Sequence, residues 1–111
     1  MMLTGCHKVQ KFTTEKWDSG DGLNFPIRNS IVDDLLQNHK LKGLKYRQIT
    51  HLLRYPQYMD STRFNYEIIR TYTHMRKPDH IKNLIFYMDK NSVITKVELY
   101  DNQAEVKSKY F

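Results

Sequence analysis

The chain has 111 residues, of which 40% are hydrophobic and 13% aromatic, a composition typical of one folded domain and not of a disordered chain. Its net charge of +6 favours anionic partners. No stretch approaches the ~20 apolar residues of a membrane-spanning helix, and the single cysteine excludes an internal disulfide and a zinc site built on several thiolates.

Residues 1–6 read MMLTGC, and the tetrapeptide that ends at Cys6 has the pattern of a bacterial lipobox, in which the cysteine is lipidated during export. The residues before Cys6 have no positive charge and no apolar run of about 7–15 residues, both of which an export signal needs. We interpret this segment as the tail of a signal peptide that begins upstream, with Cys6 as the lipidated residue. A chance match of four residues is the alternative.

Residues 1–16 are predicted to form a flexible leader or tether, and residues 17–111 a single α+β domain. The segment up to Pro26 combines polar residues with Gly20 and Gly22 and has no sustained periodicity. Spaced aromatic residues are expected to attach this segment to the domain, namely Phe12, Trp17 and Phe25.

Two amphipathic helices are expected next. Apolar residues recur at helical spacing over residues 27–40, which predicts the first helix. A second helix is predicted after Gly43. It must end at Tyr55, because Pro56 disfavours helical geometry in the residue before it.

Three strands follow, in which apolar residues alternate with a period of two. The first covers about residues 63–73, and the second and third include residues 84–88 and 93–99. Residues 89–92 are predicted to form a hairpin turn. The order of elements predicts an α+β fold, with two N-terminal helices packed on one face of a three-stranded antiparallel β-meander. The predicted core consists of Ile31, Leu35, Ile49, Leu52, Leu53, Phe64, Ile68, Leu84, Phe86, Val97 and Leu99.

Motifs for catalysis are absent from the sequence: it has no G-x-S-x-G, no H-E-x-x-H, no phosphate-binding glycine loop and no dinucleotide fingerprint. Cys6 lies in the predicted leader, which disfavours a catalytic thiolate held near a base. His74 and His80 lie six residues apart around Asp79, whereas helical metal ligands prefer i, i+4 spacing. We therefore predict a protein that is not an enzyme and has no cofactor and no metal site.

The segment LKGLKYRQITHLLRYPQY, residues 41–58, is similar to the helix–turn segment of small bacterial outer-membrane lipoproteins of the SmpA/OmlA (BamE-like) type. In their pattern Leu is followed by Gly-Met-Thr, an amphipathic turn, Leu-Leu-Gly and Pro. Gly43 matches the first glycine, and Leu44 stands for the methionine. The end of the pattern is matched by Leu52, Leu53 and Pro56. The resemblance covers about residues 17–100, including the order of elements, and is closest to uncharacterised lipoproteins of that type.

Two positions depart from the family pattern. Lys45 replaces the hydroxyl residue that would cap the second helix, and Arg54 replaces the glycine that would end it. Without that glycine, the turn after the helix must avoid the left-handed conformation or accept strain. The resemblance implies a BamE/BLIP-like fold on the periplasmic face of the outer membrane, anchored by lipid on Cys6. In some members it also implies an accessory role in β-barrel assembly and contact with anionic lipid.

A basic stretch gives the candidate interaction surface. Between Leu35 and Met59 the sequence contains no Asp or Glu. The turn between the predicted helices is therefore a candidate surface for anionic lipid or an envelope protein. At a membrane, Tyr46 is expected to lie at the depth of the lipid headgroups. The surface consists of Lys40, Lys42, Lys45, Tyr46 and Arg47. A solvated helix face is the alternative explanation of these charges.

Three classes of function remain. The first is a non-enzymatic, lipid-anchored interaction module of the cell envelope that faces the periplasm and is linked to outer-membrane assembly or integrity. The second is a small basic cytosolic nucleic-acid-binding protein, because Tyr46, Tyr55 and Tyr58 are interleaved with the cations. No recognised nucleic-acid motif is present, so no nucleic-acid partner is expected. A protein inhibitor, suggested only by analogy of fold, ranks last.

Overall fold

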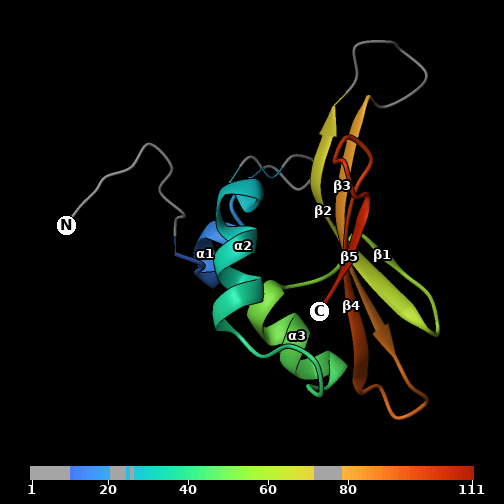
Figure 1. Ribbon diagram of the computed structural model, residues 1–111. Coiled ribbons are helices and arrows are strands. Elements are labelled where there is room, and N and C mark those ends of the chain that lie inside the picture. Colours follow the sequence, from blue (N-terminus) through green and yellow to red (C-terminus); the bar gives the residue numbers. More distant parts are fainter. Residues whose placement is uncertain (1–10, 21–24, 26, 72–78) are drawn as a thin grey trace.

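The computed structural model describes residues 11–20, 25, 27–71 and 79–111. In this part of the chain, three helices lie on one face of a five-stranded antiparallel sheet (Figure 1), which confirms the α+β class. The sheet follows chain order from β1 to β5, so each strand pairs with its neighbour in sequence. The elements are α1 (Thr14–Trp17), α2 (Arg28–Asn38), α3 (Tyr46–Leu53), β1 (Tyr58–Met59), β2 (Arg63–Thr71), β3 (His80–Met88), β4 (Ile94–Asp101) and β5 (Ser108–Tyr110).

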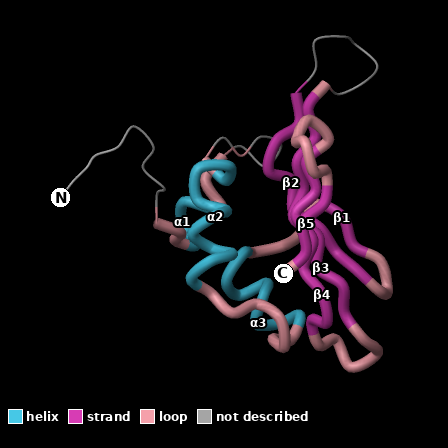
Figure 2. The backbone as a smooth tube through the Cα atoms, in the orientation of Figure 1, coloured by secondary structure: helices cyan, strands magenta, loops and turns pink. Residues whose placement is uncertain are grey.

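The sheet has two more strands than the three predicted, which correspond to β2, β3 and β4. The additional strands lie at the two edges of the sheet (Figure 2), where β1 pairs with β2 and β5 pairs with β4. They have only two and three residues. Such short segments show no alternation in sequence, because strand signals need runs of about 4–8 residues.

Two irregularities in strand pairing decide which residues enter the core. The register of β2 shifts between Glu67 and Ile69, so that both Ile68 and Ile69 pack on the helical side. The pairing of β3 with β4 shifts in the same way at the start of β4. The third predicted strand begins at residue 93, but Val93 precedes β4 and the buried residue is Ile94. A bulge inserts one residue and thereby reverses the alternation that a sequence pattern assumes.

The core lies between the helices and the sheet and contains every predicted core residue. Leu52 and Leu99 are only partly buried at its edge, and the others are buried. The aromatic rings of Phe64 and Phe86 stack at its centre, with centroids 5.1 Å apart. The core also includes three aromatic residues outside the predicted set, namely Phe12, Trp17 and Tyr66.

The packed part of the chain includes residues before the predicted domain start at residue 17. Helix α1 begins at Thr14, where Thr13 accepts a hydrogen bond from the Lys16 backbone N–H on its side chain. Phe12 is buried, and its backbone N–H donates to the Asp34 carboxylate of α2 over 2.7 Å. This hydrogen bond lowers the pKa of Asp34 below its usual value. Residues 11–16, which belong to the predicted leader, are thus part of the folded helical layer. Residues 1–10 lie outside the described residues.

A buried arginine joins the N-terminal segment to the sheet. Arg28, the first residue of α2, has no solvent exposure. Its Nε donates to the Trp17 carbonyl over 2.8 Å, and its Nη1 donates to the Gln57 side chain over 2.7 Å and to the Glu67 carbonyl over 2.8 Å. The guanidinium also lies 3.5 Å from the centroid of the Phe25 ring. Burial lowers the pKa of Arg28 to about 10, because desolvation disfavours the charged form.

Replacing Arg28 with Ala is expected to lower the free energy of unfolding by about 3 kcal/mol or more, because buried acceptors in α1 and β2 lose a charged donor. Arg28→Lys is expected to lower the free energy of unfolding by nearly as much. The lysine ammonium lacks the planar, forked guanidinium that donates to the Trp17 carbonyl on one side and to the Glu67 carbonyl on the other. Urea unfolding followed by Trp17 fluorescence measures both. The exposed Arg47→Ala is the matched control, with an expected change within about half a kcal/mol. A comparable loss for Arg28→Ala and Arg47→Ala would contradict this role.

Candidate anion-binding surface on helix α3

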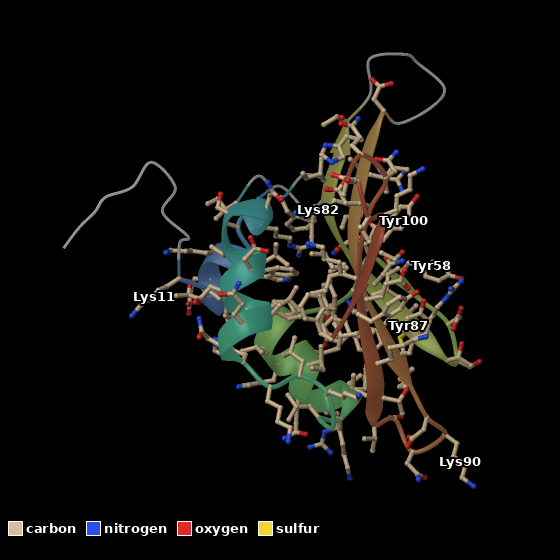
Figure 3. The ribbon with its side chains drawn as sticks, in the orientation of Figure 1. Lys11, Tyr58, Lys82, Tyr87, Lys90 and Tyr100 are labelled. Carbon is tan, nitrogen blue, oxygen red and sulfur yellow. The ribbon has the colours of Figure 1, made fainter. Side chains whose placement is uncertain are left out.

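Helix α3 presents a polar and basic face because its apolar residues are turned inward. Ile49 and Leu53 are buried, and Leu52 is partly buried against the core. The opposite side of the helix is therefore directed outward, and it carries the exposed residues Arg47 and His51. Nitrogen-tipped side chains extend from this side of α3, away from the sheet (Figure 3).

The start of α3 is fixed to the hairpin between β3 and β4. The Gly43 N–H donates to the Ile94 carbonyl over 2.8 Å, and the Ile94 N–H donates back to the Leu44 carbonyl over 2.7 Å. The Tyr46 N–H donates to the Ser92 carbonyl over 2.8 Å. Gly43 has φ of 93°, a conformation that favours glycine. The basic face of α3 is thus attached to a rigid part of the sheet.

Lys45 precedes the helix as its N-cap, and its side chain makes no capping hydrogen bond. The other half of a capping box is present, because the Gln48 side chain accepts a hydrogen bond from the Lys45 backbone N–H over 2.9 Å. The missing hydroxyl cap leaves the lysine side chain at the entrance of the helix, where it adds a cation to the outward face.

The outward face of α3 and the residues after it form an open hollow of about 880 Å³. We call it the α3 hollow; it is lined by Lys45, Arg47, Gln48, Thr50, His51, Arg54 and Tyr55. None of these residues is acidic, and the Arg54–Asp18 contact at 3.9 Å, between half-exposed side chains, is a weak ion pair. The exposed phenol of Tyr55 stands beside the cations. The hollow is chemically suited to phosphate or carboxylate groups.

Arg54 ends α3 in a conformation that is normally restricted to glycine. Its φ is 67° and its ψ is −157°. Hydrogen bonds hold it there: its N–H donates to the Thr50 carbonyl over 2.8 Å, and its carbonyl accepts from the Tyr66 hydroxyl over 2.7 Å. Of the two outcomes expected for a turn without glycine, the chain adopts the strained one, with a positive φ at Arg54. The strained turn thus places Arg54 among the residues that line the α3 hollow.

The structure divides the predicted interaction surface. Lys45 and Arg47 line the α3 hollow. Lys40 and Lys42 lie at a second hollow of about 170 Å³, whose apolar lining includes Leu36, Leu41, Val97 and Phe111. Tyr46, which was expected at headgroup depth, packs its ring edge-on against Phe64 with centroids 5.0 Å apart. His51, Arg54 and Tyr55 join the surface instead, and only the folding of α3 and its terminal turn brings them together.

The histidines considered as metal ligands do not form a cluster in the described chain. His80 pairs with Asp101, with 2.8 Å between Nε2 and Oδ1. Burial raises the pKa of Asp101, but a backbone hydrogen bond from Gln103 and this contact with His80 lower it further, so the net shift is downward. His74 lies outside the described residues. Among the residues described, no three His, Cys, Asp or Glu side chains are grouped as metal ligands would be.

Comparison with protein-family models, curated proteins and solved structures gives no match for this chain. Within residues 11–20, 25, 27–71 and 79–111, no helix is long and apolar enough to span a membrane. The assignment of the candidate site therefore rests on the geometry of the α3 hollow alone.

Replacing Arg54 with Gly is expected to raise the free energy of unfolding by about 1 kcal/mol. The substitution relieves backbone strain of about 1–3 kcal/mol, but glycine also increases the conformational entropy of the unfolded chain, which offsets part of the gain. Chemical denaturation measures the change. Arg54→Ala is the control, since it removes the same charge but keeps the strained Cβ, and no gain is expected from it. Equal stabilisation by Gly and Ala would show that charge, and not the backbone, determines the effect.

Proposed function

We propose that this protein is a non-enzymatic, lipid-anchored interaction module of the bacterial cell envelope. In this proposal, lipid on Cys6 tethers the domain to the periplasmic face of the outer membrane, and the α3 hollow binds phosphate groups of anionic lipid. The link to outer-membrane assembly or integrity follows from the family resemblance of residues 17–100. Cys6 itself lies outside the described residues.

The observation that carries the proposal is the α3 hollow, which is lined by Lys45, Arg47 and Arg54 and has no acidic lining residue. A tethered domain meets the membrane at high local concentration, so weak contacts become effective. Each Lys or Arg near an anionic surface contributes about 1 kcal/mol of binding free energy. This attraction decays with distance from the surface over about one Debye length. Lys11, the first described residue, also lies on the helical side of the molecule (Figure 3), in the layer that carries the hollow.

A cytosolic nucleic-acid-binding protein is the second candidate, because the same hollow fits nucleic-acid phosphates. The specific observation in its favour is Tyr55, whose side chain is 79% exposed beside Arg47 and Arg54. An exposed ring beside cations is the arrangement on which single-stranded bases stack. Binding of a single-stranded oligonucleotide that exceeds binding to anionic vesicles would favour this candidate.

The first test of the proposal measures binding to vesicles of phosphatidylglycerol and phosphatidylcholine, using Cys6→Ala protein without lipid. Weak co-sedimentation is expected at low salt, with most of it lost at physiological salt because exposed cations are screened. The triple variant Lys45→Gln, Arg47→Gln, Arg54→Gln should lose most of this binding. The matched control removes three cations elsewhere, through Lys90→Gln, Lys107→Gln and Lys109→Gln.

The control variant is expected to retain most of the binding, because its cations do not line the hollow. A further variant, Lys40→Gln with Lys42→Gln, measures the contribution of the turn between α2 and α3. If the two triple variants weaken binding equally, net charge alone is responsible. Absence of binding at low salt would leave the α3 hollow as a solvated face and contradict the lipid proposal.

The lipid anchor is tested in the source cell with Cys6→Ala protein expressed from its full upstream sequence. The variant is expected to remain as an uncleaved precursor and to be missing from the outer-membrane fraction, because the acceptor sulfur is absent. Fractionation and intact-mass spectrometry measure both effects. Recovery of the natural protein as a soluble, unlipidated chain in the cytosol would contradict the lipoprotein assignment.

A further inference from the structure

The sheet face opposite the helices has no covering element among the described residues (Figure 1). Strand register shows which side chains occupy it. Phe64, Phe86 and Val97 are neighbours in β2, β3 and β4 and are buried toward the helices. The residues next to them in each strand therefore point the other way. Figure 3 shows Tyr58, Tyr87 and Tyr100 on this outer side.

One row of residues crosses the outer face through all five strands. Tyr58 pairs with Asn65, Asn65 with Ile85, Ile85 with Glu98, and Glu98 with Tyr110. In the adjacent row, Tyr87 pairs with Arg63 on one side and with Lys96 on the other. We call the centre of this surface the tyrosine face, formed by Tyr58, Ile85, Tyr87, Lys96, Glu98 and Tyr110.

A buried carboxylate organises the tyrosine face. Glu98 is only 7% exposed although it points outward, which is rare for an acidic residue. Its Oε1 accepts a hydrogen bond from the Tyr87 hydroxyl over 2.6 Å, and its Oε2 accepts one from the Ser108 hydroxyl over 2.7 Å. Burial raises the pKa of Glu98, but these hydrogen bonds and one from Tyr110 lower it further, so the net shift is downward. Both carboxylate oxygens of Glu98 thus already accept hydrogen bonds from within the protein.

The cation on this face is Lys96, which attracts the Glu98 carboxylate electrostatically and contributes to its lowered pKa, but forms no close ion pair with it. The Lys96 ammonium lies 4.4 Å from the centroid of the Tyr87 ring and 5.0 Å from that of the Tyr110 ring. Among the described residues, no carboxylate lies within 4.0 Å of this ammonium. Two rings fix the position of a normally flexible chain, which reduces the entropy lost on binding.

The composition of the tyrosine face is that of a protein interface. Tyr58 and Tyr110 are 50% and 57% exposed, and tyrosine is enriched at interfaces because it contributes area at a small cost in entropy. A second copy of the chain is a poor occupant, because each copy carries a net charge of +6 and repels the other. A nucleic acid is also disfavoured, since the tyrosine face carries one lysine beside the Glu98 carboxylate and offers no cluster of cations for phosphates.

From this arrangement we infer that the tyrosine face is the docking surface for an acidic segment of a partner protein. A carboxylate of the partner pairs with Lys96, and neighbouring apolar side chains of the partner cover Ile85 and the tyrosine rings. The charge of the partner complements both the local cation and the net charge of the domain. Because the face lies opposite the helices, a protein bound there does not compete with the α3 hollow (Figure 1).

The inference is tested by NMR titration of the ¹⁵N-labelled chain with a blocked pentapeptide of alternating Glu and Leu. The background carries Lys45→Gln, Arg47→Gln and Arg54→Gln, so that the acidic probe finds no cations in the α3 hollow. Shifts are expected in β3, β4 and β5 around the tyrosine face. The same peptide with Lys in place of Glu is expected to cause none.

Adding Lys96→Gln to this background should weaken binding about fivefold, the equivalent of one favourable exposed ion pair. Lys90→Gln is the matched control, since this exposed lysine lies in the β3–β4 turn at the end of the sheet (Figure 3), and no change is expected. Equal weakening by the two substitutions, shifts with both peptides, or shifts elsewhere on the protein would overturn the inference. Concentration-dependent shifts of the tyrosine face without peptide would assign it to a second copy and also overturn it.

Discussion

Burial of the Arg28 guanidinium is the interaction on which the arrangement of the layers depends. Removing a cation from water costs several kcal/mol, and here Nε and Nη1 find hydrogen-bond partners while the buried Nη2 has none. These partners come from separate parts of the chain: the Trp17 carbonyl ends α1, the Gln57 side chain precedes β1, and the Glu67 carbonyl lies in β2. One side chain thereby fixes the N-terminal segment, the end of the helical layer and an edge of the sheet.

The same constraint extends to the α3 hollow. Gln57 accepts hydrogen bonds from both Arg28 and the Glu67 N–H, and this anchors the chain three residues after Arg54. On the other side, the Tyr66 hydroxyl holds the Arg54 carbonyl. The turn that contains Arg54 and Tyr55 is therefore fixed at both ends to buried groups. A packed core can sustain a strained backbone in this way, and such strain often accompanies a binding site.

The molecule consequently has two chemically different surfaces on opposite sides of one core. The α3 hollow offers cations without acidic neighbours and is suited to diffuse contact with phosphates. The tyrosine face has a single cation fixed between rings and a carboxylate whose hydrogen bonds are already occupied. The first arrangement suits a charged surface of variable geometry, whereas the second suits a partner of defined shape. In the function we propose, these two surfaces would connect a membrane and a protein.

The sequence by itself determined the α+β class, the two main helices, the three long strands and nearly all of the core, because these depend on the local periodicity of apolar residues. It also located the cations of α3 and the departure at Arg54. Only the tertiary structure decided the edge strands β1 and β5 and the bulges near Ile68 and Ile94, since these depend on which strand lies alongside. No motif or periodicity in the sequence singles out Arg28 or Glu98. Their burial results from contacts with residues up to 39 positions away, which no local pattern encodes.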